Sequence, residues 1–187
     1  MENKFYAFYT WNFLNTLAGV PRYYLERQRN GTWGNNPKER DMFDDLIFGD
    51  YPDYLESPLD FQITEGTKLR DVIETRYLNC YLISDRLKDL YTTEGLTGWK
   101  TYEVNVTNKR GKGTIEGFNG FSVIGRNPQT KGESTTVPDF FRLLPKGVGI
   151  ICTQKVFDVL KKHKIKDFDL WPLDDHNHKH LFDLINF

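Results

Sequence analysis

The fold is decided by the stretch NCYLISDRLKDLYTTEGLTGWKTYEV, residues 79–104. Its opening apolar run predicts a buried strand, and Ser84 directly after that run is a natural helix N-cap. The next apolar residues recur with the spacing of one helical face: Leu87, Leu90 and Tyr91. Gly95 suits the left-handed position just past a helix end, and the β-branched and aromatic content of WKTYEVNV favours another strand. We therefore expect a strand, a helix and a strand in succession.

The same pattern returns at residues 148–173, VGIICTQKVFDVLKKHKIKDFDLWPL. A shift of 69 residues, without a gap, places Thr153 on Ser84 as a second cap. That shift also pairs apolar residues of the second copy with those of the first: Val156, Val159, Leu160, Ile165, Phe168, Trp171 and Leu173 with Leu87, Leu90, Tyr91, Leu96, Trp99, Tyr102 and Val104. Two interpretations stay open, an internal duplication or two uses of a common strand–cap–helix–strand arrangement. Two copies are too few for a solenoid.

Other segments predict further elements and complete the fold class. Residues 5–18 fit a strand or a short helix, and the helical spacing within 67–79 predicts a short helix. GFSVIG at 120–125 predicts a strand inside the glycine-rich, basic stretch 107–145, whose glycines are typical of turns rather than of a nucleotide-binding loop. We predict an α+β fold with a mixed sheet or sheets and two similar strand–helix–strand units, 79–104 and 148–173, in its C-terminal half.

The chain of 187 residues is short enough for one domain with an N-terminal subdomain. We predict an acidic and aromatic N-terminal segment at 1–57, a candidate subdomain, and an α+β domain at 58–187. No stretch has the length and apolarity of a membrane span, so we expect a cytoplasmic protein without a membrane partner. Cys80 and Cys152 lie in apolar runs and are predicted to be inert core thiols of a reducing compartment.

Charge is distributed unevenly along the chain although the formal net charge is only −1. A net charge so close to zero argues against direct nucleic-acid binding. Residues 41–60, DMFDDLIFGDYPDYLESPLD, hold seven acids and no base, mixed with aromatic residues. Such a segment is either an ordinary acidic surface or a docking surface for a basic partner, because complementary charge speeds encounter and aromatic anchors hold a complex. The predicted contact residues are Asp41, Asp44, Asp45, Phe48, Asp50, Tyr51, Asp53 and Tyr54.

Two kinds of catalytic chemistry compete with a binding role. The C-terminal DDHNHKH offers Asp174, His176 and His178 as metal ligands of a metal-assisted hydrolase, although a solvated loop explains the same residues and no established metal-binding spacing is present. Ser84 follows a strand and opens a helix as a nucleophile would, but its counterpart Thr153 makes helix capping the simpler interpretation. We therefore predict no catalytic residues and no cofactor.

Several motifs resemble a known group of bacterial proteins. They are the PLDF lead-in at 58–61, the ISDRL cap and helix, LTGW at 96–99, GFSVIGR, and the late strand and helix PKGVGIICTQKV. Over about residues 58–173 the chain resembles immunity proteins of polymorphic toxin systems, of the immunity-protein-eleven and forty-three type. The shared motifs concern structure and not chemistry.

The resemblance implies a non-enzymatic protein that binds and neutralises a cognate protein toxin, and it carries no binding residues onto this chain. Because many such toxins are basic nucleases, the acidic segment 41–60 would suit a basic nuclease as the partner. A structural or interaction protein without a toxin partner is the remaining alternative. The sequence leaves the oligomeric state open.

Overall fold

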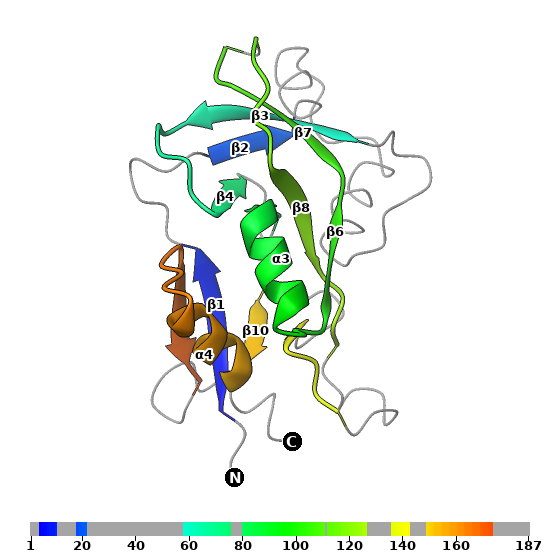
Figure 1. The fold of residues 1–187 in the computed structure, drawn as a ribbon, viewed down its shortest axis with the longest axis vertical. Helices are drawn as coiled ribbons and strands as arrows, with labels where there is room; N and C mark the ends of the chain where they lie inside the picture. The colour runs from blue at the N-terminus through cyan, green and yellow to red at the C-terminus, as the bar shows by residue number, and fades with distance from the viewer. Residues whose placement is uncertain are drawn as a thin grey trace, which may run out of the picture. The chain divides into compact units, whose positions relative to one another are not determined.

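The computed structural model of the chain describes residues 4–10, 18–21, 58–75, 80–110, 112–126, 136–142 and 149–173. Within these ranges it contains strands in two sheets and two α-helices, an α+β architecture (Figure 1). The chain divides into two compact units: one of Met1–Trp11, Leu90–Lys100 and Val123–Phe187, the other of Asn12–Asp89 and Thr101–Ser122. No helix among the described residues is long and apolar enough to cross a membrane.

The first unit contains a four-stranded antiparallel sheet. Its strand order is β11 (Phe168–Pro172), β1 (Phe5–Thr10), β10 (Ile150–Thr153) and β9 (Phe140–Arg142). Helix α4 (Gln154–Lys162) packs on β1 and β10, as Figure 1 shows. The helix buries the face that the apolar spacing predicts: Val156, Val159 and Leu160.

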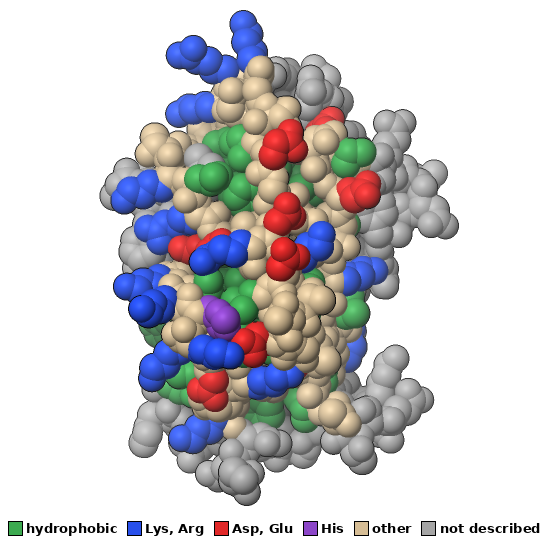
Figure 2. Space-filling model, in the orientation of Figure 1, with side chains coloured by type: hydrophobic (Ala, Val, Ile, Leu, Met, Phe, Trp, Pro, Cys, Tyr) green, Lys and Arg blue, Asp and Glu red, His purple; other side chains and the backbone are tan. Residues whose placement is uncertain are grey.

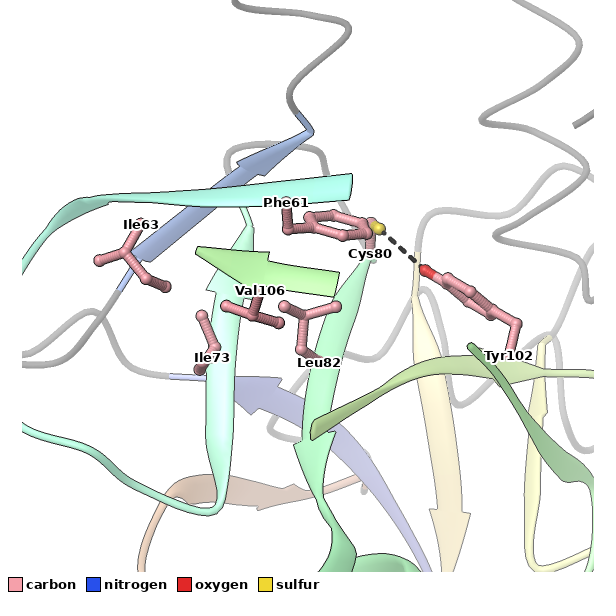
Figure 3. Close-up of a cluster of buried hydrophobic side chains, with 7 residues drawn as sticks. All are labelled: Phe61, Ile63, Ile73, Cys80, Leu82, Tyr102 and Val106. Carbon is pink, nitrogen blue, oxygen red and sulfur yellow. Dashed lines mark hydrogen bonds between the residues drawn. The ribbon is translucent and has the colours of Figure 1, made fainter. Parts of the chain in front are cut away.

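The other sheet has seven strands in the order β6, β8, β5, β4, β2, β3 and β7. Their bounds are Trp99–Tyr102, Phe118–Val123, Tyr81–Ser84, Val72–Thr75, Ala18–Pro21, Leu59–Glu65 and Val104–Thr107. The sheet is mixed because β2 pairs with β4, and β3 with β7, in parallel. Its core, drawn in Figure 3, holds Phe61, Ile73, Leu82 and Val106, which are all nearly inaccessible to solvent. Burial of these apolar side chains is the main stabilising contribution here.

The two predicted copies are confirmed, and their elements match residue for residue. Shifted by 69 residues, β5 and α3 (Asp85–Thr93) fall on β10 and α4, while β6 falls on the first four residues of β11. The ends of the helices agree as well. The N–H of Leu96 donates to the carbonyl of Tyr91 at 2.9 Å, and the N–H of Ile165 donates to the carbonyl of Leu160 at 2.9 Å.

The likeness extends to two strands that the sequence comparison did not include. β4 precedes and pairs with β5 as β9 precedes and pairs with β10. β8 pairs with β5 through Phe118 opposite Ser84, and β1 pairs with β10 through Phe5 opposite Thr153. We call residues 71–102 with 118–123 the first motif, and residues 139–172 with 5–10 the second motif.

The two motifs differ in chain order, which explains why the second is incomplete in a simple alignment. In the first motif β8 follows β6 along the chain, whereas its counterpart β1 lies at the start of the chain, ahead of β9. The counterpart strands still share a pattern, FNGF at 118–121 and FYAF at 5–8. The second motif is therefore related to the first by a circular permutation.

Two expectations about secondary structure need correction or refinement. The predicted helix at 67–79 is wrong, because Val72–Thr75 form β4 between β5 and β2. Its β-branched Val72 and Ile73 are both buried in the sheet, and this packing overrides the few residues at helical spacing. WKTYEVNV forms two strands, β6 and β7, separated at Glu103. Of the stretch 5–18, residues 5–10 form a strand.

Candidate functional site

Both sites predicted from the sequence fall outside the described residues. This applies to the acidic contact residues Asp41, Asp44, Asp45, Phe48, Asp50, Tyr51, Asp53 and Tyr54, and to the ligand candidates Asp174, His176 and His178. Both therefore stay predictions. Across the described ranges, no group of three or more His, Cys, Asp or Glu side chains is arranged to hold a metal ion.

The first motif places a carboxylate, a hydroxyl and a guanidinium together at the start of α3. Ser84 donates its hydroxyl proton to Asp71 Oδ1 at 2.7 Å and accepts the N–H of Leu87 at 3.1 Å, which makes it a functioning N-cap. Arg86 Nε donates to the same Asp71 oxygen at 3.1 Å. Burial opposes ionisation of Asp71, but the hydrogen bonds from Arg86 and Ser84 prevail and lower the pKa of its carboxyl group.

The second motif repeats this arrangement at the start of α4. Thr153 donates its hydroxyl proton to Asp139 Oδ1 at 3.0 Å, and Lys155 Nζ lies 3.3 Å from Asp139 Oδ2. Thr97 adds two more bonds to Asp139 Oδ2, from its N–H at 2.9 Å and from its hydroxyl at 3.1 Å. Unlike Ser84, Thr153 makes no side-chain hydrogen bond to the backbone of its helix.

The equivalence of the two clusters assigns them a structural role. Asp71, Ser84 and Arg86 correspond to Asp139, Thr153 and Lys155, and in both motifs the hydroxyl residue also donates its backbone N–H to the carbonyl of that aspartate. Each cluster ties the strand before the helix to the aspartate that opens the neighbouring strand. Ser84 caps α3 as predicted and also holds Asp71. The prediction that the Thr153 side chain caps α4 is wrong, because its hydroxyl donates to Asp139 instead.

The two cysteines are buried, and neither forms a disulfide. The Cys80 sulfur lies 3.4 Å from the hydroxyl of Tyr102 within the core of the seven-stranded sheet (Figure 3). Burial raises the pKa of the Cys80 thiol. Burial, and then the nearby Asp139 carboxylate, raise the pKa of Cys152 far above its ordinary value. Both thiols are therefore protonated at neutral pH and poor nucleophiles.

A pocket of about 320 Å³ in the first unit is a feature that the sequence reasoning missed. It lies between the last turns of α4 and strand β11, with Leu160, Phe168 and Leu170 among its apolar lining residues. Three lysines also line it: Lys161, Lys164 and Lys166. The one feature of the sequence that could have indicated this pocket is Lys164, which occupies the position after the helix where the first copy has Gly95.

No protein-family model matches this chain, and a search of curated proteins found no significant relative.

Proposed function

We propose that this chain is a non-enzymatic binding protein of the immunity type, which binds and neutralises a cognate bacterial toxin in the cytoplasm of the producing cell. The observation that carries the proposal is the use of one carboxylate–hydroxyl–cation cluster in both motifs. Ser84 and Thr153, which sit where a nucleophile would, are held by Asp71 and Asp139 at 2.7 Å and 3.0 Å. Residues that serve as paired structural ties support a scaffold for binding rather than a reactive centre.

Cys152 supports the same proposal. It is the last residue but one of β10 and lies two residues before α4, where a helix N-terminus would stabilise a thiolate. Its side chain is fully buried, however, and its raised pKa keeps the thiol neutral. The motifs at 58–61, 83–87 and 96–99, which resemble those of immunity proteins, suggest the functional class, because binding a toxin needs a stable surface and no chemistry.

We propose that the toxin contact lies on the acidic and aromatic segment 41–60, with Asp44, Asp45 and Asp53 among its charged residues. A basic toxin, such as a nuclease, would be attracted to it over several ångströms at low salt. The test is co-expression in a bacterial host with the product of the adjacent gene. We expect that product to arrest growth alone and this protein to restore growth.

A charge-reversal variant separates contact from folding. Asp44→Lys, Asp45→Lys and Asp53→Lys together should slow association with the purified toxin by about tenfold or more at low salt, with a smaller effect at high salt. A matched variant with the same charge change on exposed acids elsewhere, Asp89→Lys, Glu116→Lys and Asp158→Lys, should associate faster than the first variant. Equal association rates for the two variants would contradict the contact assignment.

The competing metal-assisted hydrolase is tested on the same preparations. Binding by the acidic segment does not involve His176 or His178, so His176→Ala with His178→Ala should protect the host as well as the unmodified chain does. A stoichiometric metal in the purified untagged protein, lost in this double variant together with protection, would favour the hydrolase.

A further inference from the structure

The pocket of about 320 Å³ beside α4 can be compared with the equivalent region of the first motif. That motif has the same elements but lacks the three lysines that line the pocket. At the positions of two lining residues, the first motif carries large aromatic residues, Tyr91 and Trp99, whose ring centroids are 5.5 Å apart in an edge-on arrangement. The indole N–H of Trp99 also donates to the carbonyl of Leu96 at 2.9 Å. In the second motif Leu160 replaces Tyr91 and Phe168 replaces Trp99. Both replacements are smaller, although Phe157 also lines the pocket where the first motif has Lys88.

The residues around this space have changed in charge. Lys161, Lys164 and Lys166 line the pocket where the first motif carries Thr92, Gly95 and Thr97. Three neutral positions have thus become three cationic ones. Figure 2 shows many Lys and Arg side chains on this face of the molecule, with Asp and Glu side chains among them.

Lys164 is the most informative of the three. Its φ is 56°, in the left-handed region, and Gly95 has a φ of 60° at the same place. A side chain in this conformation costs about 1–2 kcal/mol relative to the right-handed region, a penalty that glycine avoids. Strained backbone of this kind clusters at ligand-binding sites. A lysine at a position where glycine is favoured therefore indicates a use for its side chain.

An ordinary structural explanation covers only part of the pattern. Lysines in the last turn of a helix interact favourably with its dipole, which explains Lys161 and Lys162. Lys162 also pairs with Glu94 at 2.8 Å and does not line the pocket. Neither the dipole nor Glu94 explains Lys164 and Lys166, which follow the helix and flank Ile165 at the pocket. Asp169 lies between the lining residues Phe168 and Leu170 on β11 and does not itself line the pocket. Successive side chains of a strand point to opposite faces, so Asp169 does not account for Lys164 and Lys166.

We propose that this pocket binds a small aromatic carboxylate, with its ring between Leu160 and Phe168 and its carboxylate at Lys164 and Lys166. The volume is at the lower end of the range for small-molecule sites, and an apolar lining with a few convergent charged groups is their usual composition. At the positions of these two apolar residues the first motif carries the larger Tyr91 and Trp99. This site is independent of the proposed toxin contact on the acidic segment.

Isothermal titration calorimetry with 2-naphthoate tests the proposal, with the uncharged 2-naphthalenemethanol as the comparison ligand. We expect saturable binding of the carboxylate and weaker binding of the alcohol. Lys164→Gly should weaken naphthoate binding about two- to fivefold, the range of one exposed charge pair, and Lys166→Gln should act similarly. Lys162→Gln removes the same charge nearby without touching the pocket and should leave the affinity almost unchanged.

A variant that rebuilds the first motif gives the sharpest outcome. Leu160→Tyr with Phe168→Trp should fill the space and abolish binding while the protein stays folded by circular dichroism. If this double variant does not fold, Lys164→Gly and Lys162→Gln still decide the matter, because equal affinities in those two would overturn the proposal. The absence of naphthoate binding at millimolar concentration would overturn it as well, without affecting the toxin-binding proposal.

Discussion

Lys164 and Gly95 occupy the same position after the two helices and share a left-handed backbone, with φ of 56° and 60°. A Cβ added at Gly95 would meet no atom within 4 Å, so only the backbone conformation favours glycine there. Comparing the two positions therefore gives the free-energy cost of placing a side chain on left-handed backbone, without a contribution from steric overlap. At Gly98, by contrast, a Cβ would lie 2.0 Å from the carbonyl oxygen of Phe140, so steric overlap adds to a φ of 85°.

Substitutions at these positions should change stability in opposite directions. We expect Lys164→Gly to raise the free energy of unfolding by about 0.5–1 kcal/mol and Gly95→Ala to lower it by about 1 kcal/mol. Gly98→Ala should cost more than Gly95→Ala because of the overlap with Phe140. Urea denaturation monitored by circular dichroism measures all three. A destabilising Lys164→Gly would show that the lysine side chain stabilises the native fold.

In each cluster, sequence reasoning identifies only the hydroxyl residue. Ser84 and Thr153 are recognisable because a cap directly follows a strand and precedes a helical pattern. Their partners Asp71 and Asp139 lie on other strands, so sheet pairing and not local sequence brings them together. The pocket lysines were missed for a similar reason, because a charge run after a helix is normally a solvated end.

At the scale of one element, β4 combines two acidic groups whose pKa values shift in opposite directions. The pKa of Asp71, just before the strand, is lowered through Arg86 and Ser84 against the effect of burial. The pKa of Glu74, within the strand, is raised by burial. Its Oε2 is buried without a hydrogen-bond partner among the described residues. Ionised Asp71 therefore stabilises the folded state, and ionised Glu74 destabilises it.

The free energy of unfolding should therefore depend on pH in opposite directions through Asp71 and Glu74. Asp71 contributes stability above its unfolded pKa near 3.8, and this is lost as the pH falls through its lower folded value. Asp71→Asn should therefore destabilise the protein at pH 7 but bring little extra loss near pH 2. Glu74→Gln should stabilise it at pH 7, with the gain disappearing below the unfolded pKa near 4.5. Urea midpoints at pH 7, 4 and 2 measure both effects, and a pH-independent difference would contradict them.

Element prediction succeeded where the pattern was long and failed where it was short. The two strand–helix–strand copies were predictable because apolar spacing and a hydroxyl residue before the helix agree over more than twenty residues, and Gly95 marks the end of the first helix. The segment 67–79 was assigned to a helix on a few spaced residues, whereas β4 is set by pairing with β5 and β2. Sliding the sequence along itself by one fixed number of residues could not match β1 to β8. β8 follows the other strands of its motif along the chain, whereas β1 precedes the other strands of its motif.

For the whole molecule, the two cysteines report on folding. Cys80 has an exposed fraction of 2% and Cys152 of 0%, and burial raises the pKa of both thiols. We expect neither to react with DTNB in the native protein within minutes, and both to react at once in concentrated urea. Cys152→Ser should cost more stability than Cys80→Ser, since the Cys80 site already offers the Tyr102 hydroxyl as a partner. Fast, stoichiometric native labelling would contradict the buried thiols.

The molecule contains two related motifs, each held by an equivalent structural cluster, and we propose that the chain acts by binding. Activity of the purified product of the adjacent gene, recorded while this protein is added, tests that claim most directly. We predict that the activity falls in proportion to the added protein and ends at about equimolar amounts, as expected for tight occlusion. Unchanged activity in the presence of a large excess of this protein would contradict the proposed function.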